Sequence, residues 1–454
     1  MSPRRFFYLC ALFVWHEERL KRNAQYAEEC RRERSKVLGV KIVRASLLLA
    51  GAILSGAGAA AQDVTGQYVT TPTSSVMRAP GQLPPEVAQA LTLERAGRTV
   101  EAIAAWQRVV AEQPGNGQAW AQLGLLQAHE GRYREAIDAY RKAQAATPQI
   151  PGLELNLGLA LFKSDRFQEA APIFAQRLHA HPGDERLLVL EAMSLYGEHK
   201  YAEAVPYLKQ AAAEDRTNLQ IRLTLAHCLL WTHQLEATLA VYKEILEINP
   251  NSAAADMIAG EALDEKGDNA GAVEQFRAAE KANPNEAQVH FGLAYLLWAQ
   301  KRYEEAIPEF LAELKNDPGN SQARMYLGDT YMQLQQYDKA RLELTAAERA
   351  MPKEPLPHLD LGIIAQETNH RAMALRELKE TVALAPGNVN AHFRLARIYQ
   401  QMGDREQAKA EFEKTKTLNK NRDESLHQRI AEANARPDAN AGAAKSAAGQ
   451  TPQQ

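Results

Sequence analysis

Proline recurs along this chain at a fixed interval of 34 residues. It occupies eight positions of this series, and Arg216 fills the one gap: Pro114, Pro148, Pro182, Pro250, Pro284, Pro318, Pro352 and Pro386. A fixed period of this length is the sequence signature of a structural repeat, in which one small unit stacks on copies of itself. We therefore expect most of the chain to form one elongated array rather than several globular domains.

Other positions repeat with the same period. When each proline is numbered 32, ten repeats run without insertion from Leu83 to Arg422. Position 8 is always Gly or Ala, and position 20 is Ala in every repeat except the fifth, which has Thr238. Position 24 is large and apolar throughout, from Trp106 in the first repeat to Phe412 in the tenth. This pattern predicts two helices per repeat that cross closely at positions 8 and 20, with position 24 filling the space beside them.

The pattern resembles the tetratricopeptide repeat. That repeat has W-x2-L-G near its start, as in Trp120 to Gly124, then Ala and an aromatic residue in its second half and Pro at its end. The resemblance covers residues 83–422 and implies an all-α, right-handed superhelical solenoid of helix-turn-helix repeats. It also implies a scaffold that binds other proteins and carries no catalytic activity.

The segments around the repeats are short and biased in composition. Residues 62–82 form a low-complexity Thr/Ser/Pro linker, and residues 437–454 form a polar tail that we expect to be disordered. Residues 423–436 have the pattern of one more helix, which we expect to cap the solenoid. Since residues 83–422 belong to the repeats, no segment is left to form a second, catalytic domain.

The N-terminal region indicates export. In residues 40–61, basic residues precede an apolar run, and Ala59–Ala61 offers small residues for cleavage before Gln62, as in a signal peptide. We interpret residues 1–39 as a mis-assigned or extended leader, because signal peptides begin at the initiator methionine. The expected location is the bacterial periplasm or the outside of the cell. The alternative is a membrane anchor formed by residues 45–61, and only this uncleaved segment would then contact the membrane.

Charge and cysteine content exclude some classes of partner. The first 61 residues hold 11 of the 53 Lys and Arg but only 5 of the 56 Asp and Glu, so their removal lowers the formal net charge from −3 to −9. An acidic body disfavours nucleic acid, whose binding depends on basic surface. Only Cys228 then remains, which excludes an intramolecular disulfide and predicts a buried small apolar residue.

We find no motif for catalysis, a cofactor or a metal, and we expect none of the three. His290, His358 and His392 all fall at position 4, but stacked repeats are too far apart for two of these residues to share one zinc ion, so packing roles are expected. His179, His181 and His199 are expected to be exposed loop residues. An enzyme would need converging polar groups, and only the acidic Glu261, Asp264 and Glu265 with His227 offer any. They lack a nucleophile, a base and an orienting group in one set.

In proteins of this repeat family, positions 2, 5, 9, 12 and 13 of the first helix usually face the concave groove where ligands lie. These positions give the candidate partner-binding residues Leu155, Leu159, Phe162, Met193, Tyr196, Leu223, His227, Trp231, Met257, Glu261, Phe291, Tyr295, Trp298, Met325, Asp329, Met332, Phe393 and Arg397.

Such a lining suits an amphipathic helix or an extended apolar peptide, because aromatic residues supply binding area and Met adapts to varied partners. The alternative is that these residues pack on the neighbouring first helix and never contact a ligand. A second functional possibility is a factor for cell-envelope assembly or polysaccharide export. The identity of the partner and the oligomeric state stay open.

Overall fold

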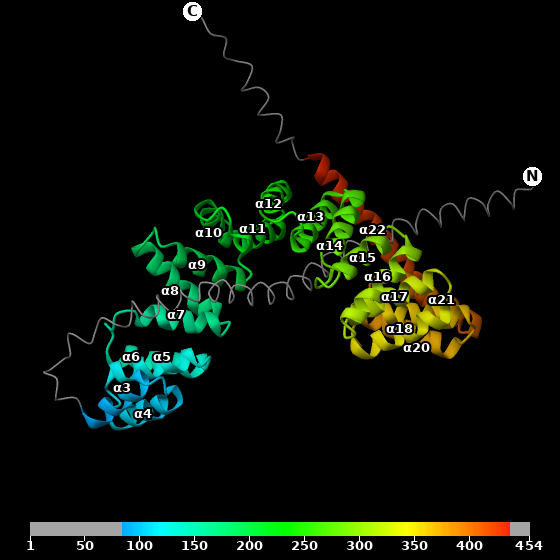
Figure 1. Ribbon diagram of the computed structural model, residues 1–454. Coiled ribbons are helices and arrows are strands. Elements are labelled where there is room, and N and C mark those ends of the chain that lie inside the picture. The colour runs from blue at the N-terminus through cyan, green and yellow to red at the C-terminus, as the bar shows by residue number, and fades with distance from the viewer. Residues whose placement is uncertain (1–83, 436–454) are drawn as a thin grey trace, which may run out of the picture. The chain divides into compact units, whose positions relative to one another are not determined.

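In the computed structural model, residues 84–435 are described, and these residues form 20 α-helices and no β-strand (Figure 1). The fold is the predicted all-α solenoid of helix-turn-helix repeats. The predicted leader, signal peptide and linker (1–82) and the C-terminal tail (437–454) lie outside the described residues. Within residues 84–435, no helix is both long enough and apolar enough to cross a bilayer.

The chain divides into two compact units at Val289 and His290. In both units, odd-numbered helices are the first of a repeat (helix A) and even-numbered helices are the second (helix B). The first unit contains α3 (Pro85–Arg95), α4 (Thr99–Glu112), α5 (Gly117–His129), α6 (Tyr133–Ala146), α7 (Leu153–Lys163), α8 (Phe167–Ala180), α9 (Glu185–Gly197), α10 (Tyr201–Glu214), α11 (Leu219–Trp231), α12 (Leu235–Ile248), α13 (Ala253–Lys266) and α14 (Asn269–Ala282). The second unit contains α15 (Val289–Ala299), α16 (Tyr303–Asn316), α17 (Ser321–Gln333), α18 (Tyr337–Ala350), α19 (Pro355–Glu367), α20 (Arg371–Leu384), α21 (Val389–Met402) and α22 (Arg405–Ala435).

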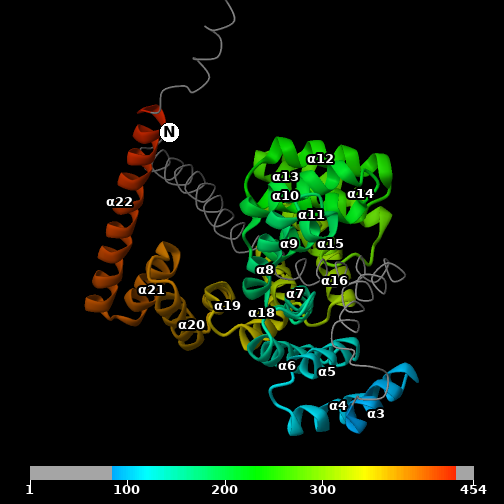
Figure 2. The same ribbon diagram turned by 90° about the vertical axis from the view of Figure 1, so that its left-hand side faces the viewer.

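The last helix differs from the prediction. A separate capping helix was expected at residues 423–436, but α22 runs unbroken from Arg405 to Ala435 and packs on α21 (Figure 2). The sequence between these two residues contains neither Gly nor Pro, so nothing in the chain stops helix B of repeat ten. The predicted cap is therefore an extension of that helix.

The helices of a repeat cross where the small residues were predicted. A Cβ atom added to Gly124 would lie 2.7 Å from the Tyr140 ring, and one added to Gly260 would lie 2.7 Å from the Phe276 ring. Position 20 is buried in all ten repeats. At these two glycines even a methyl group would push helix A away from the position 24 side chain of helix B.

Helices stack in order along each unit. Each helix A packs on its own helix B, as α5 does on α6, and each helix B packs on the next helix A, as α6 does on α7. Helices A also contact one another across repeats, as α5 does with α7, α11 with α13 and α17 with α19. The first helices therefore form the more closely spaced row of each unit, which is the inner row of a curved array.

The turn between helix A and helix B has the same backbone conformation in every repeat. Position 15 is left-handed in all ten, with glycine in four repeats, such as Gly131 and Gly403. The other six repeats have non-glycine residues at φ between 57° and 61°: Asp165, His199, His233, Lys301, Gln335 and Asn369. A left-handed residue ends helix A and reverses the chain, but costs an L-residue about 1 to 2 kcal/mol.

We predict that Gln335→Gly stabilises the second unit by a net 0.5 to 1 kcal/mol or so, because relief of the left-handed strain outweighs the extra freedom of glycine in the unfolded chain. Urea unfolding followed by circular dichroism measures the change. Gly131→Ala is the matched reverse variant: its added methyl would have open space, so only the backbone would oppose it. Lower stability of the Gln335→Gly variant would contradict the prediction.

Candidate protein-binding surface

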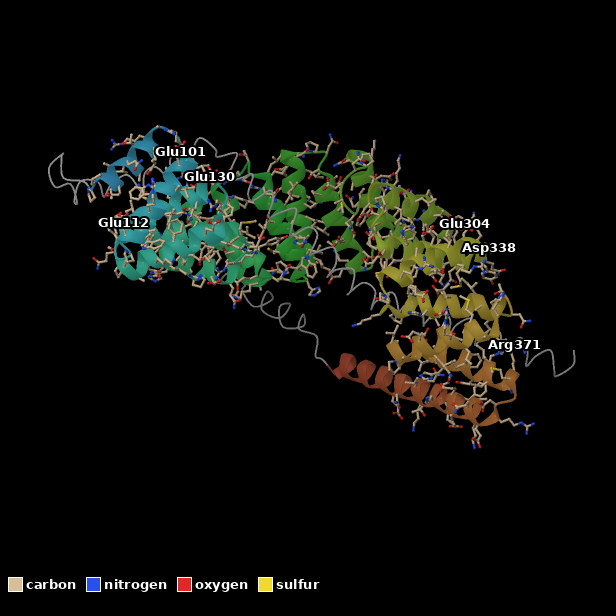
Figure 3. All side chains as sticks on the ribbon, turned by 90° about the horizontal axis from the view of Figure 1, so that it is seen from below. Glu101, Glu112, Glu130, Glu304, Asp338 and Arg371 are labelled. Carbon is tan, nitrogen blue, oxygen red and sulfur yellow. The ribbon has the colours of Figure 1, made fainter. Side chains whose placement is uncertain are left out.

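The two helices of a repeat present different chemistry. Charged side chains stand out from helices B and the turns, as the labelled Glu101, Glu304, Asp338 and Arg371 show (Figure 3). All four are exposed. The candidate partner-binding residues instead all lie on helices A, the inner row of each unit. The candidate residues and the labelled charged residues therefore lie on different helices of a repeat.

The structure divides the eighteen candidate residues by exposure. Ten of them are at most 6% exposed and pack within the helix stack: Leu155, Phe162, Met193, Tyr196, His227, Met257, Phe291, Tyr295, Met325 and Asp329. Six are partly exposed: Leu159, Leu223, Trp231, Glu261, Trp298 and Met332. Phe393 and Arg397 are exposed. In each unit, the accessible part of the candidate surface is thus formed by four of the last eight residues.

An aromatic cluster forms the centre of this surface in the first unit. The Tyr196 hydroxyl lies 2.9 Å from His227 Nδ1, and the Trp231 indole N–H donates to His227 Nε2 at 2.9 Å. Tyr201, from helix B of repeat four, lies beside Trp231 with a ring-centroid distance of 5.5 Å. Rings from α9, α10 and α11 are therefore held against one another, and the partly exposed Trp231 is fixed in place.

These hydrogen bonds determine the protonation of His227. An indole N–H can only donate, so Nε2 must accept, and the ring proton must lie on Nδ1, where it donates to the Tyr196 oxygen. Burial lowers the pKa of His227 to about 4. The imidazole is thus neutral at neutral pH, and both of its nitrogens are engaged within the protein.

The low pKa predicts acid sensitivity of the first unit. The unfolded chain binds a proton at His227 below about pH 6.5, whereas the folded chain does not until about pH 4, so folding is destabilised as the pH falls through this window. We expect His227→Gln to reduce this loss by up to about 1.4 kcal/mol per pH unit. Urea unfolding from pH 7 to pH 4 tests this. Parallel pH profiles for the two proteins would contradict the assignment.

A second aromatic group lies in the second unit. Trp298 packs on Tyr326 with a ring-centroid distance of 4.8 Å, and its indole N–H donates to Asp329 Oδ2. Gln333 donates to the other carboxylate oxygen of Asp329 at 3.0 Å. As with Trp231, the indole N–H is satisfied inside the protein. The ring of Trp298 is partly exposed in a fixed orientation.

A second buried acidic residue, Asp360, lies beside Asp329. Burial, together with the Asp329 carboxylate, holds the pKa of Asp360 well above its usual range, and Arg394 opposes this only in part. The protonated form of Asp360 is favoured, which can donate a hydrogen bond to Asp329. Arg394 Nη1 donates to Gln366 at 2.7 Å. In the second unit, the residues beside Trp298 are therefore charged or polar, whereas those around Trp231 in the first unit are mainly aromatic.

The predicted acidic patch of repeat six is only partly available. Asp264 is buried, and Glu261 is partly buried. Glu265 pairs with His233 Nδ1 from the turn of repeat five. Asp264 and Glu265 are thus engaged within the protein. The patch therefore exposes less negative charge to solvent than the sequence predicts.

Four residues of these clusters were not among the candidates. Tyr201 lies on helix B, which the groove positions do not include, and Tyr326, Asp360 and Arg394 share position 6 of successive repeats. The sequence places Asp360 and Arg394 at the same position of repeats nine and ten. This pattern could have predicted a polar contact between those two repeats. Tyr201 gave no such signal, because its role follows from the contact between two repeats.

Comparison with known protein families identifies the repeat. One family model, described as tetratricopeptide repeat, matches residues 87–151, 259–321 and 308–355, and a second with the same description matches residues 195–261 and 370–431. Together they cover more than half of the chain. The protein therefore belongs to the tetratricopeptide-repeat family, and it has the architecture of a protein–protein interaction scaffold.

Solved structures of repeat proteins match parts of the chain at low identity. YrrB, described as a TPR protein with an unusual peptide-binding site, is 21% identical over 40% of this chain and 95% of its own, with a TM-score of 0.37. PilF from Pseudomonas aeruginosa is 21% identical over 45% of this chain and 93% of its own, with a TM-score of 0.41. A human IFIT1 dimer structure is 16% identical over 73% and 89%, with a TM-score of 0.37. No curated protein matches the chain.

Proposed function

We propose that this protein is a non-catalytic scaffold that binds a peptide or an amphipathic helix of a partner protein along its helices A. One observation carries the proposal: Trp231 is partly exposed while its indole N–H is already bonded to His227. The ring can meet an apolar group without leaving a polar atom unsatisfied.

The fixed position of Trp231 adds to its value as a contact residue. Because His227 and Tyr201 hold the ring, little side-chain freedom is lost when a partner binds. Tryptophans placed in this way are enriched among the residues that dominate binding energy. Leu159 on α7 and Leu223 on α11 are partly exposed and extend the apolar surface on the same row.

We assign no reaction to this surface. His227 is the only base that the sequence places near the acidic residues of repeat six, and its Nε2 lone pair already accepts the Trp231 N–H. The side chain is also buried. His227 therefore cannot take a proton from a substrate, whereas the Trp231 ring offers an apolar peptide a preformed contact.

We predict that a photo-crosslinking residue at position 159 or 223 captures one and the same partner from an envelope extract. The control places that residue at Leu342, an exposed apolar position on helix B. Trp231→Ala should weaken binding of the captured partner at least tenfold, as expected for a binding hot spot. Equal crosslinking from the Leu342 position, or unchanged affinity of a folded Trp231→Ala variant, would refute the proposal.

We also propose that the protein is exported and cleaved between Ala61 and Gln62. The basic residues, apolar run and small residues of residues 40–61 support this. Intact-mass measurement of the protein isolated from its own cells should give a chain that begins at Gln62. A longer chain recovered from the membrane fraction, with residues 45–61 retained, would instead support the anchor.

A further inference from the structure

The four repeats of the second unit share an ion pair between their two helices. Position 4 of helix A is basic in each, and position 23 of helix B is glutamate. The pairs are His290 with Glu309, Arg324 with Glu343, His358 with Glu377 and His392 with Glu411. Repetition of one pair at one place shows that it is first of all a structural link between helix A and helix B.

The position 4 side chain also reaches back to the preceding repeat. Arg324 Nη2 lies 3.2 Å from the carbonyl oxygen of Pro318, and His358 Nε2 lies 3.4 Å from that of Pro352. In the tautomer that carries the ring proton on Nε2, that proton points at the Pro352 carbonyl oxygen, which can only accept. The other nitrogen, Nδ1, therefore faces Glu377 Oε2, 2.9 Å away. Two electron-rich atoms at this distance need a cation between them, which is either a proton or a metal ion.

A third donor group lies beside the His358 pair. Glu348 Oε1, from helix B of the preceding repeat, lies 3.8 Å from His358 Nδ1. The ligand atoms of Glu348, His358 and Glu377 all lie within 4.8 Å of one another. The residues that correspond to Glu348 beside Arg324 and His392 are Leu314 and Val382, which offer no ligand. The ion pair between helix A and helix B thus forms without a third carboxylate in these two repeats, so the Glu348 carboxylate is not needed for the pair.

We propose that Glu348, His358 and Glu377 form a binding site for a divalent transition-metal ion such as Zn²⁺. Metal–ligand distances of 2.0 to 2.2 Å in a tetrahedral site place donor atoms roughly 3.3 to 3.6 Å apart, and the two Nδ1–oxygen distances bracket this range. Glu348 and Glu377 place two negative charges beside the ion, and Arg376 pairs with the other oxygen of Glu377. Imidazole with carboxylates favours zinc over Mg²⁺ or Ca²⁺, which prefer oxygen ligands in larger number.

The surroundings of the three residues suit such a site. His358 and Glu377 are buried, whereas Glu348 is partly exposed and leaves a side through which the ion and a water ligand can enter. The carbonyl of Pro352 orients the imidazole through Nε2, as outer groups do for histidine ligands of metals. No sequence motif indicates this site, because its ligands come from α18, α19 and α20 rather than from one short segment.

The repeats supply matched variants that test the site without removing the structural link. His358→Arg reproduces repeat eight, where Arg324 makes the same ion pair and the same carbonyl contact but cannot ligate a metal. Glu348→Val reproduces repeat ten, where Val382 occupies that position beside an intact His392–Glu411 pair. Both variants should fold, which thermal unfolding in the presence of a chelator checks.

The experiment titrates the full, untagged chain with Zn²⁺ at pH 7.5 by isothermal calorimetry, with Mg²⁺ as a control ion. We expect each variant to bind one Zn²⁺ fewer per chain than the wild type, and Zn²⁺ to raise the Tm of the second unit more in the wild type than in either variant. Mg²⁺ should have no such effect. Absence of Zn²⁺ binding by the wild type, or the same stoichiometry in all three proteins, would overturn the proposal and leave a proton as the cation at Nδ1.

Discussion

The structure depends on the close crossing of two helices in each repeat. Gly or Ala at position 8 meets the position 24 side chain, and position 20 is buried at the same crossing. Because one hairpin cannot bury its apolar face alone, each crossing is stable only when the neighbouring repeats cover it. This constraint sets the spacing of helices along the chain, and it places helices A in the inner row of each unit.

The same packing limits what that row can offer. Most candidate residues are buried because helices A contact one another as well as their own helices B. The candidate side chains that stay accessible are mostly apolar, apart from Glu261 and Arg397. Among them, Trp231 and Trp298 are held by hydrogen bonds from their indole nitrogens. The two units differ in the group that accepts the indole N–H. His227 supports the first tryptophan as a neutral ring, whereas the Asp329 carboxylate supports the second.

Residues that repeat with the period were predictable from the sequence, and contacts between repeats were not. The crossing at positions 8, 20 and 24 follows from residue size alone, and so does the assignment of ten helix pairs. The left-handed turn was not predictable from composition, since Lys301 and Gln335 take the conformation that Gly131 takes elsewhere. The Tyr201–Trp231 contact and the Glu348–His358 approach join different repeats, so no single-repeat pattern indicates them. The continuity of α22 through the predicted cap could have been predicted, because neither Gly nor Pro separates residues 405–422 from residues 423–435.

The central claim is that helices A, and not helices B, bind the partner. Hydrogen–deuterium exchange of the chain alone and in complex with its captured partner tests this most directly, since it reports on every helix without a substitution. The account predicts slower exchange in α7, α9 and α11 on binding, with α8, α10 and α12 unchanged. New protection confined to helices B, or spread equally over both rows, would contradict it.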